Sequence, residues 1–183
     1  LPLARTSQID LLAVDVTLLT AFAERARQAA QHGDQVLRDF VGMLIDAGNA
    51  ENALLIAGEP AVSDGPSLFV RGGRWFPIGA FLAVARAGSY AEAVTRLAAV
   101  NARSTLALSE AASPDVARVD RTFVVNLLEW LARASRIDPL STAPLLRVLM
   151  LVEAQSRDLR ALAWGAVLGT PPSLRLQQLV TPA

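Results

Sequence analysis

Apolar side chains at helical spacing are the feature that most restricts the fold of this 183-residue chain. The clearest example, residues 34–57, carries Val36, Leu37, Phe40, Val41, Leu44 and Ile45. Recurrence at three and four positions is the pattern of one face of an amphipathic helix. Composition agrees, because hydrophobic residues make up 52% of the chain and aromatic residues only 5%, so the apolar content is mostly Ala, Leu and Val. We therefore predict an all-α fold.

Capping residues divide this pattern into separate helices. Asp15 and Asp34 are each placed to cap a helix that begins at the next residue. Ser89 with Glu92 three positions later forms a capping pattern, and Ser113-Pro114 is a strong helix start. The expected helices cover residues 16–30, 34–57, 78–87, 89–100, 102–112, 113–135, 140–168 and 172–180.

The order of these helices predicts the architecture. The first two should form an antiparallel hairpin, and residues 58–73 hold Gly and Pro turn chemistry that predicts the main loop. We expect a multi-helix orthogonal or antiparallel bundle of one or two lobes, packed as one compact body. Residues 1–76 would form the helical hairpin plus loop, and residues 77–183 a C-terminal helical lobe.

The mean hydropathy of +0.37 is high, so the longest apolar stretch, residues 144–169, must be considered as a membrane span. Five charged residues interrupt it: Arg147, Glu153, Arg157, Asp158 and Arg160. That is too many for a span of roughly 20 apolar residues. We predict a buried core helix instead, with Pro144 either in its first turn or at a kink.

Composition argues against several classes of function. The chain has no Cys and a single His, which leaves no thiolate chemistry and almost nothing for a zinc site. The 17 basic and 17 acidic residues cancel, and the best candidate for a DNA-recognition helix, residues 113–135, mixes carboxylates among its arginines. No serine lies in a hydrolase setting. We therefore expect no enzyme activity, no cofactor, no metal and no nucleic-acid partner.

Two local motifs have ordinary structural interpretations. His32 stands beside Gly33 at an expected helix end, where an imidazole can bond the last carbonyls and complement the helix dipole. Residues 71–74 read Arg-Gly-Gly-Arg and superficially resemble a phosphate loop, but they lack its Gly-x-x-x-x-Gly-Lys-Ser/Thr spacing. We predict a turn with two exposed arginines.

Polar residues within two apolar helices are the candidate site residues. Asp46 and Asn49 are three positions apart on one face, which predicts a buried hydrogen-bond network rather than a metal site. Residues 153–160 are the most polar part of the most apolar helix. There Glu153 and Arg157 form an i, i+4 pair, with Arg160 on the adjacent turn. This cluster is either structural pairing within the chain or a polar interface for a partner protein.

Short motifs follow one another in a distinctive order. Near the C-terminus these are Pro144-Leu145-Leu146, Glu153-Ala154-Gln155, Asp158-Leu159-Arg160 and Gly169-Thr170-Pro171-Pro172. Upstream, Asp46 and Asn49 form an Asp-x-x-Asn helix motif, followed by the Gly72-Gly73 turn. This order resembles the C subunit of bacterial and archaeal V/A-type ATP synthases, called the d subunit in eukaryotic vacuolar ATPases. The chain departs from that family at Leu54-Leu55-Ile56, where an Arg is usual, and at Gln155, where the family has Glu.

The resemblance implies helical lobes in a funnel and a mechanical role. Such subunits sit on the cytoplasmic side of the membrane ring, seat the foot of the central shaft and couple the two for proton or sodium transport. The implied partners are shaft and ring subunits, with membrane contact only through them and no cofactor. The chain is much shorter than the whole protein in that family, so we expect an N-terminal lobe to be missing. The alternative hypothesis is a helical-repeat scaffold or adaptor unrelated to ATPases.

Overall fold

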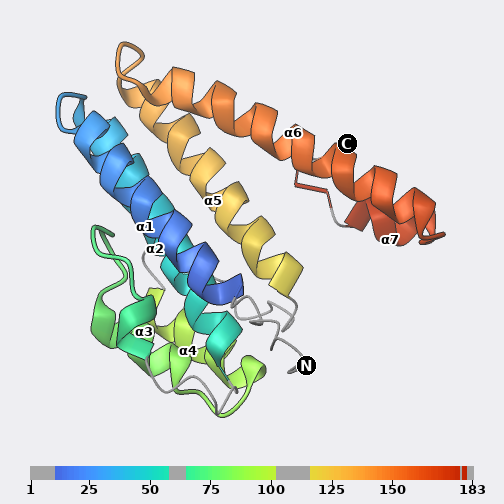
Figure 1. Cartoon of the computed structure of the whole chain (residues 1–183). Coiled ribbons are helices and arrows are strands. Elements are labelled where there is room, and N and C mark those ends of the chain that lie inside the picture. The colour runs from blue at the N-terminus through green and yellow to red at the C-terminus, as the bar shows by residue number, and fades with distance from the viewer. Residues whose placement is uncertain (1–10, 58–64, 102–115, 178, 181–183) are drawn as a thin grey trace, which may run out of the picture.

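The regular structure is helical throughout the part of the chain that the computed structural model describes, residues 11–57, 65–101, 116–177 and 179–180 (Figure 1). This confirms the predicted all-α class. The elements are α1 (Leu11–Ala30), α2 (Gln35–Ile56), the 3-10 turn η1 (Gly65–Leu68), α3 (Ile78–Ala85), α4 (Tyr90–Asn101), α5 (Val116–Ile137), α6 (Ala143–Val167) and α7 (Pro172–Gln177). The helix expected at residues 102–112 and the start at Ser113-Pro114 lie outside the described residues.

Local capping chemistry explains the helix starts that the sequence predicts correctly. The Leu37 N–H donates to the Asp34 carboxylate at 2.8 Å, so Asp34 caps α2. The Glu92 N–H donates to Ser89 Oγ at 3.3 Å at the start of α4. Pro144 lies in the first turn of α6, where its missing N–H costs no helical hydrogen bond.

Two predicted helix starts are wrong. The first helix begins at Leu11, so Asp15 lies within it rather than at its start. Leu11, Leu12 and Ala13 are good helix formers, which explains why the helix extends upstream of residue 15. The sixth helix begins at Ala143 rather than near residue 140. The chain turns there instead, and Ser141 Oγ donates to the Asp138 carbonyl at 2.7 Å. Short-range hydrogen bonding by Ser and Asp competes with helix in this way.

The central element is α2, which lies beside α1 in an antiparallel hairpin and contacts a second hairpin formed by α5 and α6 (Figure 1). Each of the three apolar clusters that the described residues form contains part of α2. Its first half packs against α5 and α6, its middle packs against α1, and its second half packs against α3, α4 and the beginning of α5. Twelve of its 22 residues are buried, so α2 is the helix around which the others assemble.

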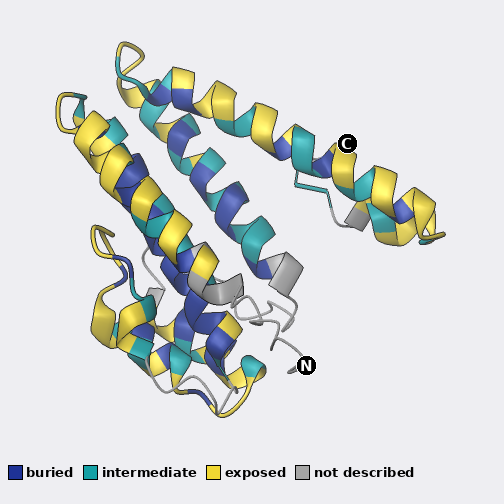
Figure 2. Ribbon diagram, viewed as in Figure 1, coloured by how far each residue is buried: buried dark blue, intermediate teal, exposed yellow. Residues whose placement is uncertain are grey.

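The longest helix, α6, is not the buried core helix that its composition predicts. One side packs on α5 and α7, and its buried residues are Ala143, Leu146, Ala154, Asp158 and Gly165. Many residues along the helix are exposed (Figure 2). They include large apolar residues on its other sides. The prediction failed because the described chain covers α6 mainly from one side. Among the described helices, none is long and apolar enough to cross a membrane.

One carboxylate joins the turns at the ends of the two hairpins. Besides capping α2, Asp34 accepts hydrogen bonds from the Thr142 N–H at 2.6 Å and from Thr142 Oγ1 at 2.8 Å. Thr142 immediately precedes α6, so this side chain links the α1–α2 turn to the α5–α6 turn across 108 positions of sequence. Asp34 therefore serves both a local and a long-range contact.

Replacing Asp34 should separate these two contributions. We expect Asp34→Ala to lower the free energy of unfolding by about 1–3 kcal/mol, because it removes both the helix cap and the acceptors for Thr142. Asp34→Asn keeps a good capping oxygen but loses one acceptor, so its loss should be about half as large. Urea unfolding followed by circular dichroism measures both, and an unchanged midpoint for Asp34→Ala would contradict the assignment.

Candidate functional site

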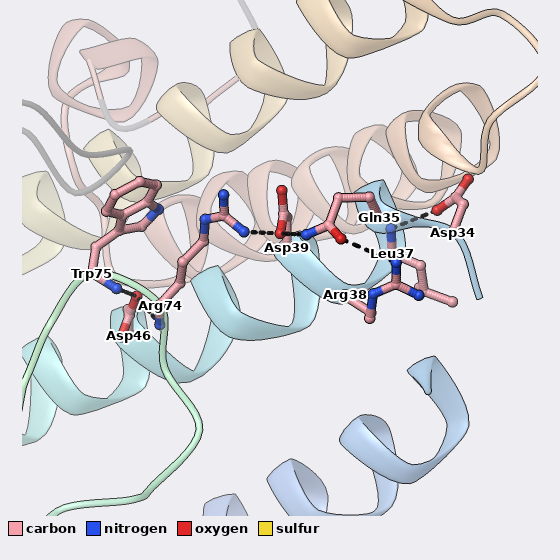
Figure 3. Close-up of polar contacts among 8 residues, drawn as sticks. All are labelled: Asp34, Gln35, Leu37, Arg38, Asp39, Asp46, Arg74 and Trp75. Carbon is pink, nitrogen blue, oxygen red and sulfur yellow. Dashed lines mark hydrogen bonds and ion pairs between the residues drawn. The ribbon is translucent and has the colours of Figure 1, made fainter. Parts of the chain in front are cut away.

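A buried carboxylate on α2 fixes the segment that leads into α3. Asp46 is fully buried, and it accepts backbone hydrogen bonds from Arg74 at 2.8 Å and Trp75 at 2.7 Å (Figure 3). It also accepts one from the Phe76 N–H at 3.2 Å. Burial raises the pKa of Asp46 above its ordinary value, although these three N–H groups act in the opposite direction. Gly73 packs so closely that a Cβ there would lie 1.8 Å from Asp46 Oδ1. The segment therefore needs glycine at this position.

Asn49 holds the beginning of the same segment, residues 70–76, by hydrogen bonds. Its side-chain amide donates to the Val70 carbonyl at 2.8 Å and accepts from the Val70 N–H at 2.8 Å. Both Asp46 and Asn49 thus bond to the backbone of residues 70–76 rather than to each other. This is a buried network within the chain, as the polar pair on an apolar helix predicts.

The turn held by this network presents a cation and an aromatic ring to solvent. Arg71 and Arg74 are both exposed, as expected for a turn with two arginines, and Gly72 has a φ of +114°. Arg74 forms an ion pair with Asp39 and lies 4.8 Å from the centre of the Trp75 ring. His32 lies exposed in the turn that ends α1, at the helix end where it was expected.

A second polar cluster joins three helices. Arg157 on α6 donates from Nη1 to both carboxylate oxygens of Asp120 on α5 at 2.9 Å, and from Nε to Glu153 at 3.1 Å. Glu51 on α2 hydrogen-bonds Asp120. Burial and the charge of Asp120 raise the pKa of Glu51 to about 7, with Arg157 acting in the opposite direction. Two carboxylates, those of Asp120 and Glu153, therefore bond one guanidinium, and the charge of that guanidinium also acts on Glu51.

Three members of this cluster, Glu51, Asp120 and Arg157, line a cleft between the two helical hairpins. The cleft has a volume of about 300 Å³ and is lined by residues of α1, α2, α5 and α6. Its walls are mainly apolar, for example Phe22, Leu44 and Phe123, and its charged lining residues are Glu51, Asp120 and Arg157. Apolar walls with a few convergent polar groups are typical of binding clefts. Within the described residues, no group of His, Cys, Asp and Glu side chains is arranged to hold a metal ion.

Arg160, the remaining candidate, lies apart from both clusters. Its side chain is exposed and donates to Ser156 Oγ at 3.0 Å, whereas Glu153 and Arg157 pair with each other. The neighbouring Asp158 is buried and accepts a hydrogen bond from the Val180 N–H at 2.7 Å. The structure therefore divides the predicted polar segment of α6 among separate contacts.

Sequence reasoning missed Glu51 and Asp120 as members of the second cluster. The available signal for Glu51 was a carboxylate on the largely buried second half of α2, two positions after Asn49. No comparable signal marks Asp120, because its partner Arg157 is 37 positions away and on another helix.

The chain matches the protein family described as ATP synthase (C/AC39) subunit over residues 3–176. The chain belongs to this family. Among curated proteins it is similar to the C subunit of the A-type ATP synthase of Haloferax volcanii, with 28% identity over 144 residues. That match covers 78% of this chain and 41% of the relative, so the chain spans less than half the length of that protein. The resemblance noted from the order of motifs is confirmed.

Gly73 provides a test of the Asp46 network. Gly73→Ala should lower the free energy of unfolding by roughly 2–4 kcal/mol, because the new methyl group displaces a buried carboxylate from its N–H donors. Gly79→Ala on α3 is the matched control, since nothing lies within 4 Å of a Cβ there. The control should be neutral or slightly stabilising in a helix. Equal midpoints for the two variants in urea would contradict the proposed packing.

Glu51 predicts a specific pH dependence of stability. Its pKa in the folded chain, about 7, lies above the ordinary value of 4.5. The unfolded chain therefore loses this proton first as pH rises, so stability is greatest below pH 4.5 and falls through pH 7. Glu51→Gln stays neutral and should avoid this loss. Its unfolding free energy relative to the unchanged chain should rise by roughly 1–3 kcal/mol between pH 5 and pH 8, measured by urea titration.

The matched control is Glu92→Gln on α4. The Gly88 N–H and Arg96 hold the pKa of Glu92 below its usual value, so its contribution to stability is lost only at more acidic pH. The difference between Glu92→Gln and the unchanged chain should therefore stay constant between pH 5.5 and pH 8. If the unfolding free energies of both variants, relative to the unchanged chain, changed equally with pH, burial of Glu51 would not be the cause of the pH dependence.

Proposed function

We propose that this chain is a non-catalytic rotor subunit that couples the central shaft of a V/A-type ATPase to its membrane ring during proton or sodium transport. The observation that carries the proposal is family membership over residues 3–176. The similar Haloferax protein is named as a subunit of an A-type ATP synthase. The proposed position is the cytoplasmic face of the membrane, with shaft and ring subunits as partners and no direct membrane contact.

The internal bracing of the chain supports a mechanical role. A subunit that passes torque must keep its helices in fixed relative positions while force acts on its surface. Asp34 joins the turns at the ends of the two hairpins, and the Glu51–Asp120–Arg157 cluster joins α2, α5 and α6 further along. Two separate polar ties between the same hairpins oppose their sliding more strongly than apolar contact alone, because directional hydrogen bonds fix the register.

The candidate polar residues take different parts in this proposal. Asp46 and Asn49 are structural, since both are buried and bond the backbone of residues 70–76. Glu153 and Arg157 hold α6 against α5 through Asp120. Arg160 is assigned to a partner surface, since it is exposed and stands apart from these pairs.

The test is the coupling between ATP hydrolysis and ion transport in membrane vesicles from cells of the source organism. Vesicles depleted of this protein should lose ATP-driven proton or sodium uptake to a much greater extent than ATP hydrolysis, because a shaft detached from the ring turns without moving ions. Adding the protein back should restore uptake. If depletion changes neither activity, the rotor role is wrong and the scaffold or adaptor hypothesis is favoured.

A further inference from the structure

The cleft between the two helical hairpins is large enough for a small organic molecule. Its volume of about 300 Å³ lies at the lower end of the range of ligand pockets in proteins. Aromatic rings from two helices, Phe22 of α1 and Phe123 of α5, belong to its walls. Met43 of α2 and Met150 of α6 add thioether side chains, which adapt to the shape of a ligand. These walls suit a molecule with an aromatic or branched apolar body.

The charged groups of the cleft carry a surplus of negative charge. Glu51 on α2, Asp120 on α5 and Arg157 on α6 line it, and among the described residues α1 contributes no charged group to the lining. Arg157 donates to both carboxylate oxygens of Asp120 at 2.9 Å and to Glu153 at 3.1 Å. The guanidinium is therefore already shared by two carboxylates before Glu51 ionises. An ionised Glu51 adds a negative charge beyond those that Arg157 pairs with.

Glu51 is held in the cleft by a shared proton rather than by an ion pair. Among the described residues it belongs to none of the ion pairs, and its side chain hydrogen-bonds Asp120. A hydrogen bond between two carboxyl groups requires a proton on one of them. Burial and the charge of Asp120 raise the pKa of Glu51 to about 7, so this proton is lost close to neutral pH. Its loss leaves two adjacent carboxylates, and a cation with N–H donors can take its place.

The apolar walls indicate which kind of cation fits. A metal ion needs a shell of several oxygen ligands, and within the described part of the chain no group of His, Cys, Asp and Glu side chains is arranged to hold one. An anion would be repelled by the surplus carboxylate, and a neutral apolar molecule would leave that carboxylate without a partner. A primary ammonium group has three N–H donors, and the aromatic rings of the walls attract a cation further.

We propose that the cleft binds a hydrophobic primary amine, with its ammonium group between Glu51 and Asp120 and its apolar body against Phe22 and Phe123. The protonated amine would replace the shared proton, which leaves Glu51 as a carboxylate and releases one proton to solvent. The bound ammonium would also join α2 to α5 through two ion pairs. Binding of this kind lies beyond the proposed rotor role and does not depend on it.

Isothermal titration calorimetry of the complete protein with 2-phenylethylamine tests the proposal. The control ligands are 2-phenylethanol, which keeps the ring but carries no charge, and 3-phenylpropanoate, whose charge is reversed. We expect saturable binding of the amine at one site, about tenfold tighter than that of the alcohol, and no binding of the anion. Equal affinity for amine and alcohol, or binding of the anion, would overturn the proposal. So would absence of saturable amine binding, the result expected if another segment of the polypeptide fills the cleft.

The pH dependence of the affinity identifies the carboxyl group. Because binding displaces the proton of Glu51, the amine should bind roughly tenfold more weakly at pH 6 than at pH 8, although it stays cationic throughout. Glu51→Gln should weaken binding about tenfold at pH 8 and remove this pH dependence. Glu92→Gln on α4 is the matched control, because Glu92 pairs with Arg96 and does not line the cleft. Equal affinities of the two variants would overturn the assignment of Glu51.

A second pair of variants locates the apolar body of the amine. Phe22 lines the cleft and is 47% exposed, so Phe22→Ala should leave the far-ultraviolet circular dichroism unchanged and weaken amine binding about threefold. Leu18 lies on the same helix, is 63% exposed and does not line the cleft, so Leu18→Ala is the matched control. An affinity that is the same in both variants would place the amine elsewhere and overturn the proposal.

The amine site and the rotor role are tested separately. Failure of the amine to bind leaves the ion-coupling measurement in vesicles as the test of the rotor role. Unchanged ion coupling after depletion contradicts the rotor role, whereas the calorimetric result with the complete protein still decides the amine site.

Discussion

The arrangement of the first part of the chain depends on one buried carboxylate accepting three backbone hydrogen bonds. Asp46 accepts hydrogen bonds from the N–H groups of residues 74–76, just before α3, and so provides a partner for donors that are buried or part-buried. This contact places Phe76 in the core with 2% exposure, where it packs with α3 and α4 against α2. Asn49 holds Val70 at the other end of the same segment. A connection without regular structure is thereby fixed to the central helix.

The second polar cluster differs from the Asp46 network in how its negative charge is compensated. Asp46 is matched by N–H donors, but Glu51 and Asp120 lie together beside a single guanidinium, so full ionisation leaves excess negative charge. Burial and this repulsion both favour a protonated Glu51 near neutral pH. The arrangement is tolerated because these side chains line a cleft and do not lie in close-packed core. It therefore positions α5 and α6 against α2 through directional contacts, at some cost in stability.

The sequence was sufficient for the helices and for the caps formed by residues close together in the chain. The start of α2 follows from a hydrogen bond between Asp34 and Leu37, which are only three positions apart. The spacing of the apolar residues follows from helix geometry. Asp46 and Asn49 were also recognisable as buried, because polar side chains on an apolar face must find partners. Their partners were not predictable, since they lie 21 to 30 positions away on a segment without a periodic pattern. For the same reason, the contacts of Asp34 with Thr142 and of Arg157 with Asp120 could not be predicted, because each pair is far apart in the sequence.

The prediction that α6 is a buried core helix failed for a different physical reason from the missed long-range contacts. Hydropathy predicts that an apolar surface will be buried, but it does not predict which molecule or segment will cover that surface. A helix with apolar residues on two opposite sides gives the same signal whether its second cover comes from its own described chain or from outside it. The chain belongs to a family of ATP synthase subunits, and the interfaces of permanent assemblies resemble a domain core cut in half. An exposed apolar side on α6 is therefore compatible with membership of such a family and does not show a defect of the core.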